Sequence, residues 1–98
     1  MNSVQLYEMS KKVSKPSKRG KYQVVLHNDN HNTFDHVINC LMDVCAHNYI
    51  QAVQCAHIVH HSGKCSIFTD VWEECEDVKN ELEHLGLKVT VTKYKKHV

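Results

Sequence analysis

The chain has 98 residues, a hydrophobic content of 42%, and 12 Lys and Arg residues against 11 Asp and Glu residues. This length predicts one domain, and the near balance of charge gives no electrostatic reason to expect binding to nucleic acid or to an anionic membrane. No apolar run approaches the ~20 residues of a membrane span. The N-terminal stretch lacks the apolar block of a signal peptide, so we expect a cytoplasmic protein.

The first segment, residues 1–20, is rich in Lys and carries the chain's single Pro. Its stretch "KKVSKPSKRGK" also contains Ser and Gly, which favour irregular structure. We therefore predict a flexible basic arm over residues 1–20 and one folded domain over residues 21–98.

The folded domain is predicted to open with a strand at residues 22–26, whose Tyr22, Val24 and Leu26 share one face. Seven polar residues, "HNDNHNT", follow at 27–33. A helix is then expected, with Asn32 as its N-cap. Its apolar stripe consists of Phe34, Val37, Ile38, Leu41 and Cys45.

A second helix is predicted after Asn48, which can form a capping box with Gln51, and Gly63 is expected to end it. Its apolar positions are Tyr49, Ala52, Val53, Ala56 and Val59.

The segment "KCSIFT", residues 64–69, predicts a second strand. A third helix is expected between a capping box of Asp70 with Glu73 and a closing Gly86, and "LKVTVT", residues 87–92, predicts the last strand. The apolar side of this third helix comprises Val71, Cys75, Val78, Leu82 and Leu85. The order is β-α-α-β-α-β, which indicates an α+β domain with three helices packed on one face of a three-stranded antiparallel sheet.

Catalytic and metal-binding functions have weak support in the sequence. The chain has five Cys and nine His but only three Gly, and no nucleophile turn or phosphate-binding Gly loop is present, so an enzyme is not expected. His57, His60 and His61 are spaced to share a helix face, yet no Cys-x-x-Cys or His-Glu-x-x-His spacing accompanies them. Solvated imidazoles and buried thiols in a reducing compartment are the favoured interpretation, and a metal-binding regulatory domain stays an alternative.

His60 suggests a different chemistry because it falls at the end of the second helix. If that helix packs across the first, His60 can face the polar corner at 27–33, where Asn amides and a carboxylate would converge with a neutral imidazole. Such a set suits a primary ammonium, which has three N–H donors and one positive charge. An Asx turn with an N-cap at Asn28, Asp29 and Asn32 explains the same residues without a ligand.

Two segments together resemble the ClpS adaptors of the bacterial N-end rule pathway. They are "YQVVLHNDNHNTF" and "QAVQCAHIVHHSGKC", which are similar to the family's Asn-Asp motif and its Val-His-x-x-Gly-Lys motif about 30 residues later. The resemblance covers about residues 22–92, and the stretches "NTFDHVI" and "QC…IVH…GKC" are closest to versions from the Bacteroidetes.

The resemblance implies an adaptor without catalytic activity or cofactor. It would bind proteins whose first residue is Leu, Phe, Tyr or Trp and deliver them to a Clp AAA+ ATPase, ClpA-like or ClpC-like, with the arm engaged in hand-over. Asn28 and His60 would hold the substrate α-amino group with help from Asp29. The pocket for the first side chain and its rim would comprise Asn30, Asn32, Phe34, Val37, Ala56 and Val59.

The sequence departs from the family pattern at several of these positions. Asn30 replaces a second acid, Phe34 stands where Met is common, and Ala56 stands where many members have a bulky Met. At the start of the third helix, part of the family's ATPase-docking surface, Val71 and Glu76 replace an acid and a base. Preference among first residues therefore stays open, as does a related interaction domain that lacks N-terminal recognition.

Overall fold

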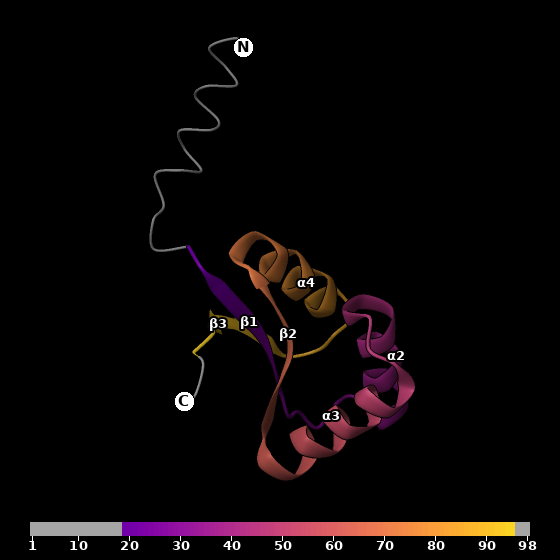
Figure 1. The fold of residues 1–98 in the computed structure, drawn as a ribbon. Coiled ribbons are helices and arrows are strands. Elements are labelled where there is room, and N and C mark those ends of the chain that lie inside the picture. Colours follow the sequence, from indigo (N-terminus) through magenta and orange to yellow (C-terminus); the bar gives the residue numbers. More distant parts are fainter. Residues whose placement is uncertain (1–18, 96–98) are drawn as a thin grey trace, which may run out of the picture.

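The computed structural model describes residues 19–95 of the chain. Within them the elements are β1 (Lys21–His27), α2 (Phe34–Cys45), α3 (Tyr49–Ser62), β2 (Lys64–Val71), α4 (Trp72–His84) and β3 (Val89–Lys93). The predicted order β-α-α-β-α-β is confirmed, and Figure 1 shows the three helices on one side of the sheet. The predicted basic arm, except for its last two residues, lies outside the described residues.

The sheet places β1 in the middle, in the order β2-β1-β3, with both neighbours antiparallel to it. Val24 of β1 is paired with Phe68 on one side and with Val91 on the other. The next residue, Val25, is paired with Ser66, so Ile67 is an extra residue in β2 and forms a β-bulge. The bulge keeps the Ile67 side chain in the core, where it is buried.

One apolar core fills the space between the sheet and the helices. Its central side chains are fully buried, and burial of each Val or Leu among them stabilises the fold by roughly 1.5–3 kcal/mol. These are Val24, Leu26, Leu41, Ala52, Cys75 and Leu82. Four positions at the ends of the predicted apolar stripes are instead exposed, because they lie where a helix begins or ends and project past the layer against which the helix packs. These are Phe34, Tyr49, Val71 and Leu85.

The first two helices begin at side-chain caps. The N-cap of α2 is Thr33 and not Asn32 as predicted: Thr33 Oγ1 accepts from His36 N at 3.1 Å. The predicted capping box of α3 is confirmed, since Asn48 Oδ1 accepts from Gln51 N at 2.8 Å and Gln51 Oε1 accepts from Asn48 N at 3.0 Å. Gly63 ends α3 as predicted, with a φ of 93° that favours glycine.

The beginning of α4 differs from the prediction. Its N-cap is Val71, which has no side chain able to cap, and Asp70 Oδ1 accepts from Val71 N at 2.7 Å. The predicted capping box of Asp70 with Glu73 is therefore wrong. At the other end Gly86, at φ 91°, follows the helix as predicted, and its N–H donates to Glu83 O at 2.9 Å.

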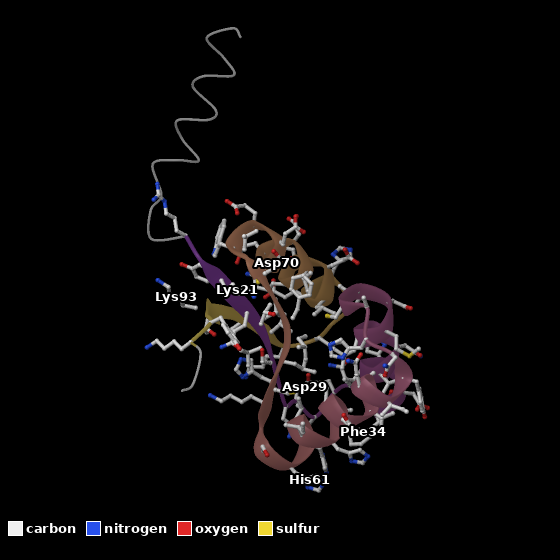
Figure 2. The ribbon with its side chains drawn as sticks, in the orientation of Figure 1. Lys21, Asp29, Phe34, His61, Asp70 and Lys93 are labelled. Atoms are coloured by element: carbon white, nitrogen blue, oxygen red, sulfur yellow. The ribbon has the colours of Figure 1, made fainter. Side chains whose placement is uncertain are left out.

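Side chains at the two ends of the molecule are well separated. Figure 2 shows Phe34 where α2 and α3 meet, His61 near the end of α3, and Asp70 at the opposite end of the molecule, where α4 begins. Any site at the α2–α3 junction is thus remote from the start of α4.

Candidate functional site

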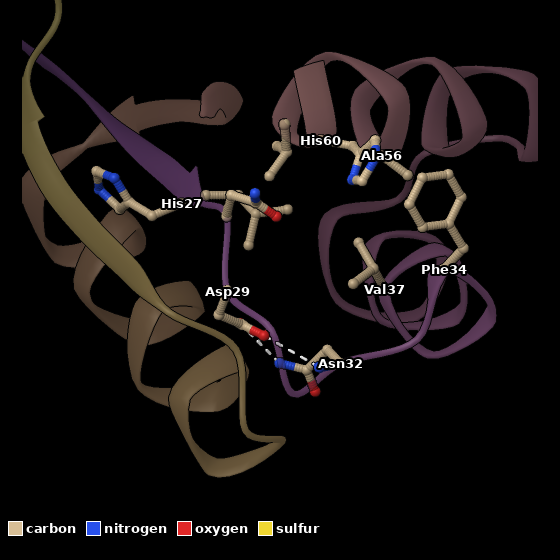
Figure 3. A pocket seen from close by; sticks show the side chains of 10 residues that line it. His27, Asp29, Asn32, Phe34, Val37, Ala56 and His60 are labelled. Atoms are coloured by element: carbon tan, nitrogen blue, oxygen red, sulfur yellow. Dashed lines mark hydrogen bonds between the residues drawn. The ribbon is translucent and has the colours of Figure 1, made fainter. Parts of the chain in front are cut away.

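A pocket lies where the loop after β1 meets α2 and α3 (Figure 3). Its cavity volume is about 30 Å³, which is room for about one or two water molecules. Ten residues line it: Leu26, His27, Asn28, Asp29, Asn32, Phe34, Val37, Ala56, Val59 and His60. Eight of the nine residues that the sequence analysis assigned to an N-terminal binding site are among them.

A backbone hydrogen bond explains why two distant segments reach the same pocket. Asn28 N donates to Gly63 O at 2.9 Å, which fixes the start of the loop against the end of α3. His60 lies on the last turn of α3, just before that carbonyl, and the pocket lining includes both Asn28 and His60. Within residues 19–95, neither of these two side chains makes a hydrogen bond to another protein group. Their polar atoms are available to a ligand in the pocket.

Asp29 organises the loop that forms the pocket's polar side. Its Oδ1 accepts from His31 N at 2.8 Å and from Asn32 N at 3.0 Å, and its Oδ2 accepts from Asn32 Nδ2 at 2.9 Å. Burial by itself would raise the pKa of this carboxyl, but these hydrogen bonds outweigh burial, and the pKa is lowered from its ordinary value. The carboxylate is therefore charged at neutral pH.

The same loop is tied to the turn after α4. Asn32 Nδ2 donates to Gly86 O at 2.9 Å as well as to Asp29. The ring of His36 in the first turn of α2 is 2.8 Å from Leu85 O, and since a carbonyl only accepts, Nε2 carries the proton. Side chains on both sides of Thr33 thus hold the loop and the start of α2 against residues 85–86.

Asn30 is the predicted site residue that the structure places outside the pocket. Its side chain is exposed, and it does not contribute to the lining. The loop turns at this point because Asp29 binds the N–H groups of residues 31 and 32, so the residue between them and Asp29 stands at the outside of the turn.

The apolar wall combines side chains from both helices. Ala56 and Val59 of α3 are buried, and Val37 of α2 is half-buried. Phe34 stands at the rim with 39% of its surface exposed. Its ring meets the rings of His57 and His60 edge to face, with centroid distances of 5.2 Å and 5.5 Å. Figure 3 shows Phe34, Ala56 and His60 grouped on one side of the pocket, opposite Asp29 and Asn32.

Two lining residues, Leu26 and His27, were not predicted as site residues. Leu26 is buried and contributes an apolar surface from the sheet, while His27 Nε2 is 2.8 Å from Thr90 Oγ1 on β3. Their position directly before Asn28 could have indicated that they line the pocket, because residues at the end of a central strand lie next to the loop that follows it.

The other histidines and the cysteines do not form a metal centre in the described part of the chain. His57 and His61 are stacked with 6.3 Å between ring centroids. No group of three or more His, Cys, Asp or Glu side chains among residues 19–95 could hold a metal ion, so the metal-binding alternative lacks a site there. Likewise, none of the helices in residues 19–95 has the length and apolar character needed to cross a bilayer.

Comparison with known proteins agrees with this arrangement. The family model described as "ATP-dependent Clp protease adaptor protein ClpS" matches residues 17–90. Among solved structures, that of Agrobacterium tumefaciens ClpS2 bound to L-phenylalaninamide is similar, with a TM-score of 0.73 and 20% sequence identity over 76% of this chain and 96% of that chain. At that identity the similarity establishes the fold. No curated protein sequence matches the chain significantly.

The family match extends over most of the chain and includes the loop, both helices of the pocket and the whole of α4. The protein therefore belongs to the ClpS family of adaptors of the ATP-dependent Clp protease.

Proposed function

We propose that this adaptor acts in the cytoplasm and binds the free N-terminus of proteins that begin with Leu, Phe, Tyr or Trp, for delivery to a Clp AAA+ ATPase. The observation that carries the proposal is the pocket itself, in which unpaired polar side chains adjoin a buried apolar wall. A peptide N-terminus offers this combination of groups: an ammonium and, next to it, the first side chain.

The polar side has suitable acceptors for an ammonium. The Asn28 side-chain oxygen and the His60 imidazole can each accept one N–H. Asp29 supplies the negative charge, but three of its roughly four lone-pair sites are already used by Asn32 and by the backbone of His31. Asp29 therefore acts mainly through its charge and by holding the loop, with one lone-pair site left for a direct or water-mediated contact.

The apolar side has room for a large residue only after a side chain moves. A cavity of about 30 Å³ is smaller than a Leu or Phe side chain. Phe34 is the lining residue best placed to move, because it is exposed on the first turn of α2 and meets the rings of His57 and His60 edge to face. Rotation of Phe34 outward opens the pocket above Ala56, and burial of the entering side chain then contributes roughly 1.5–3 kcal/mol.

Delivery requires a second contact that leaves this pocket free. We place the Clp ATPase contact at the start of α4, where Val71 is exposed and Glu76 is 4.0 Å from Lys79. This end of the molecule is opposite the α2–α3 junction, as Figure 2 shows, so substrate and ATPase can be bound together.

The test is a panel of fluorescent peptides that differ only in the first residue, with binding measured by anisotropy. Peptides beginning with Leu, Phe, Tyr or Trp should bind in the micromolar range or tighter, and those beginning with Ala or Glu should not. Removal of one hydrogen bond to an ammonium costs about 1.5–3 kcal/mol, so Asn28→Ala and His60→Ala should each weaken binding at least tenfold.

Matched controls come from neighbouring residues. His61→Ala changes the residue next to His60 on α3, and Asn30→Ala changes a residue in the same loop as Asn28. Neither His61 nor Asn30 lines the pocket. Both variants should bind nearly as well as the wild type. Acetylation of the peptide removes the ammonium charge and should weaken binding at least tenfold; equal binding of acetylated and free peptides would refute the proposal.

A further inference from the structure

Two half-buried cysteines lie on facing elements and are not part of the lining of the peptide pocket. Cys55 is on α3 and Cys65 is on β2, and these two elements pack against each other. Cys65 is paired with the buried Leu26 of β1 and therefore faces the helices, and both cysteines pack against the same apolar core. Cys40, Cys45 and Cys75 are buried, so Cys55 and Cys65 are the cysteines of residues 19–95 with partial exposure to solvent.

His47 confirms the position of Cys55 against β2 independently. His47 belongs to the loop between α2 and α3, and its Nε2 is 2.7 Å from Ile67 O on β2. Its Nδ1 is 3.9 Å from Cys55 Sγ. One imidazole thus contacts both Cys55 and the strand residue two positions after Cys65.

The hydrogen bonds of His47 also fix where its proton lies. Ile67 O only accepts, so Nε2 carries the proton and, in the neutral ring, Nδ1 presents a lone pair to the Cys55 thiol. The site therefore holds two neighbouring thiols and a base oriented toward one of them.

We propose that Cys55 and Cys65 are a reversible oxidation site, which hydrogen peroxide converts to an intramolecular disulfide. In the net reaction the two thiols lose two electrons and two protons, the S–S bond forms, and the O–O bond of the peroxide is reduced to two molecules of water. A small dithiol such as dithiothreitol reverses the reaction by thiol–disulfide exchange.

The two thiols have different roles. Burial and the neighbouring Cys65 raise the pKa of Cys55 to about 12, so Cys55 is a poor first nucleophile at neutral pH. Cys65 reacts first with the peroxide to give a sulfenic acid and water. Cys55 Sγ then attacks Cys65 Sγ while its proton moves to His47 Nδ1, and the departing hydroxide takes up a proton to leave as water.

The disulfide would link the middle of α3 to the beginning of β2 across the Gly63 turn. Closing this short loop restricts the unfolded chain and so stabilises the folded one. Neither cysteine lines the peptide pocket, so the reaction does not depend on recognition of N-termini.

The experiment treats the full chain with hydrogen peroxide and maps its peptides without reduction by mass spectrometry. We expect a Cys55–Cys65 cross-linked peptide that disappears after dithiothreitol, and a Tm of the oxidised protein at least about 5 °C above that of the reduced protein. Cys55→Ser and Cys65→Ser should each abolish both the cross-link and the Tm increase. Cys40→Ser, a change at a buried thiol in α2, should retain both.

His47→Ala provides a test of the base, since it should slow disulfide formation at least tenfold without changing which cysteines are linked. A peptide map in which Cys55 and Cys65 stay reduced, carry separate sulfinic acids, or are linked to a second molecule overturns the proposal. So does a Cys40→Ser protein that loses the cross-link while its reduced form keeps the wild-type Tm.

Discussion

Asp29 and Asn32 are joined by two hydrogen bonds, one to each carboxylate oxygen. Asn32 N donates to Oδ1 at 3.0 Å and Asn32 Nδ2 donates to Oδ2 at 2.9 Å. The pair closes the loop that supplies the polar side of the pocket, and Asn32 Nδ2 also reaches Gly86 O. Asp29 and Asn32, which the resemblance to ClpS adaptors predicts as site residues, therefore also hold the loop in shape.

The first prediction concerns the pH dependence of stability. The pKa of Asp29 is lowered in the folded protein from its ordinary value of 3.8. Asp29 therefore stabilises the fold fully above about pH 4, and this contribution is lost as the pH falls through the lower folded-state pKa. Asp29→Asn should reduce the free energy of unfolding by about 1–2 kcal/mol at pH 7 and by less once the pH is below the folded-state pKa of Asp29. Urea titrations of both proteins across this range measure the difference.

The control for this prediction is Asp35→Asn, which changes an exposed carboxyl in the first turn of α2. Its effect at pH 7 should be within about 0.5 kcal/mol. If Asp29→Asn destabilises the protein as strongly below the folded-state pKa of Asp29 as at pH 7, the hydrogen-bonded carboxylate is not the cause.

The second prediction separates the two possible caps of α2. Thr33 Oγ1 accepts from His36 N, so Thr33→Ala should cost about 1 kcal/mol of stability. Thr33→Ser keeps the acceptor and should recover most of that loss. Thr33 does not line the pocket, so binding of a Phe-initiated peptide should be unchanged in Thr33→Ala at a temperature where the variant is folded. A Thr33→Ala variant as stable as the wild type in urea would contradict the cap.

The sequence pattern was sufficient for the order of elements because the signals were local. Alternation in β1, helical spacing in α2 and α3, and the caps at Asn48 and Gly63 each depend on residues within a few positions of one another. Each of these predictions is confirmed. Where two neighbours could serve the same local role, as Asn32 and Thr33 could, the prediction was wrong.

The sequence pattern missed the correct cap of α2 because contacts between distant residues decide which side chain caps the helix. Asn32 Nδ2 donates to Gly86 O, which is 54 positions away, and to Asp29 Oδ2, so contacts outside α2 orient this amide, and Thr33 caps the helix instead. The pocket depends in the same way on the bond from Asn28 N to Gly63 O. Spacing within a helix does not reveal such closures, and the resemblance to known adaptors was needed to bring Asn28 and His60 together.

The third prediction concerns a substitution on α3 that fills the pocket. Ala56 is 3% exposed and lines the cavity, so a longer side chain at this position occupies the space above Val59. Ala56→Met should weaken binding of Phe- and Trp-initiated peptides at least tenfold and that of Leu-initiated peptides less. Gln54→Met, at an exposed position of α3 outside the lining, is the control and should bind all of them as the wild type does. An equal loss of affinity for peptides with every first residue would show that the substitution had disturbed the helix and not the pocket.

The last prediction concerns the rim. Phe34 packs edge to face on His57 and His60, at centroid distances of 5.2 Å and 5.5 Å, and is 39% exposed. Phe34→Ala should therefore cost only about 1 kcal/mol of stability, the scale of such ring contacts. Because the pocket then stands open, peptide selectivity should move toward Trp: the ratio of Trp to Leu affinity should rise several-fold, as measured by anisotropy. Phe34→Leu keeps an apolar rim of smaller size, so its ratio of Trp to Leu affinity should lie between those of the wild type and Phe34→Ala. An unchanged ratio in Phe34→Ala would mean that the first side chain does not pass this ring, and that Val37, Ala56 and Val59 set the preference without it.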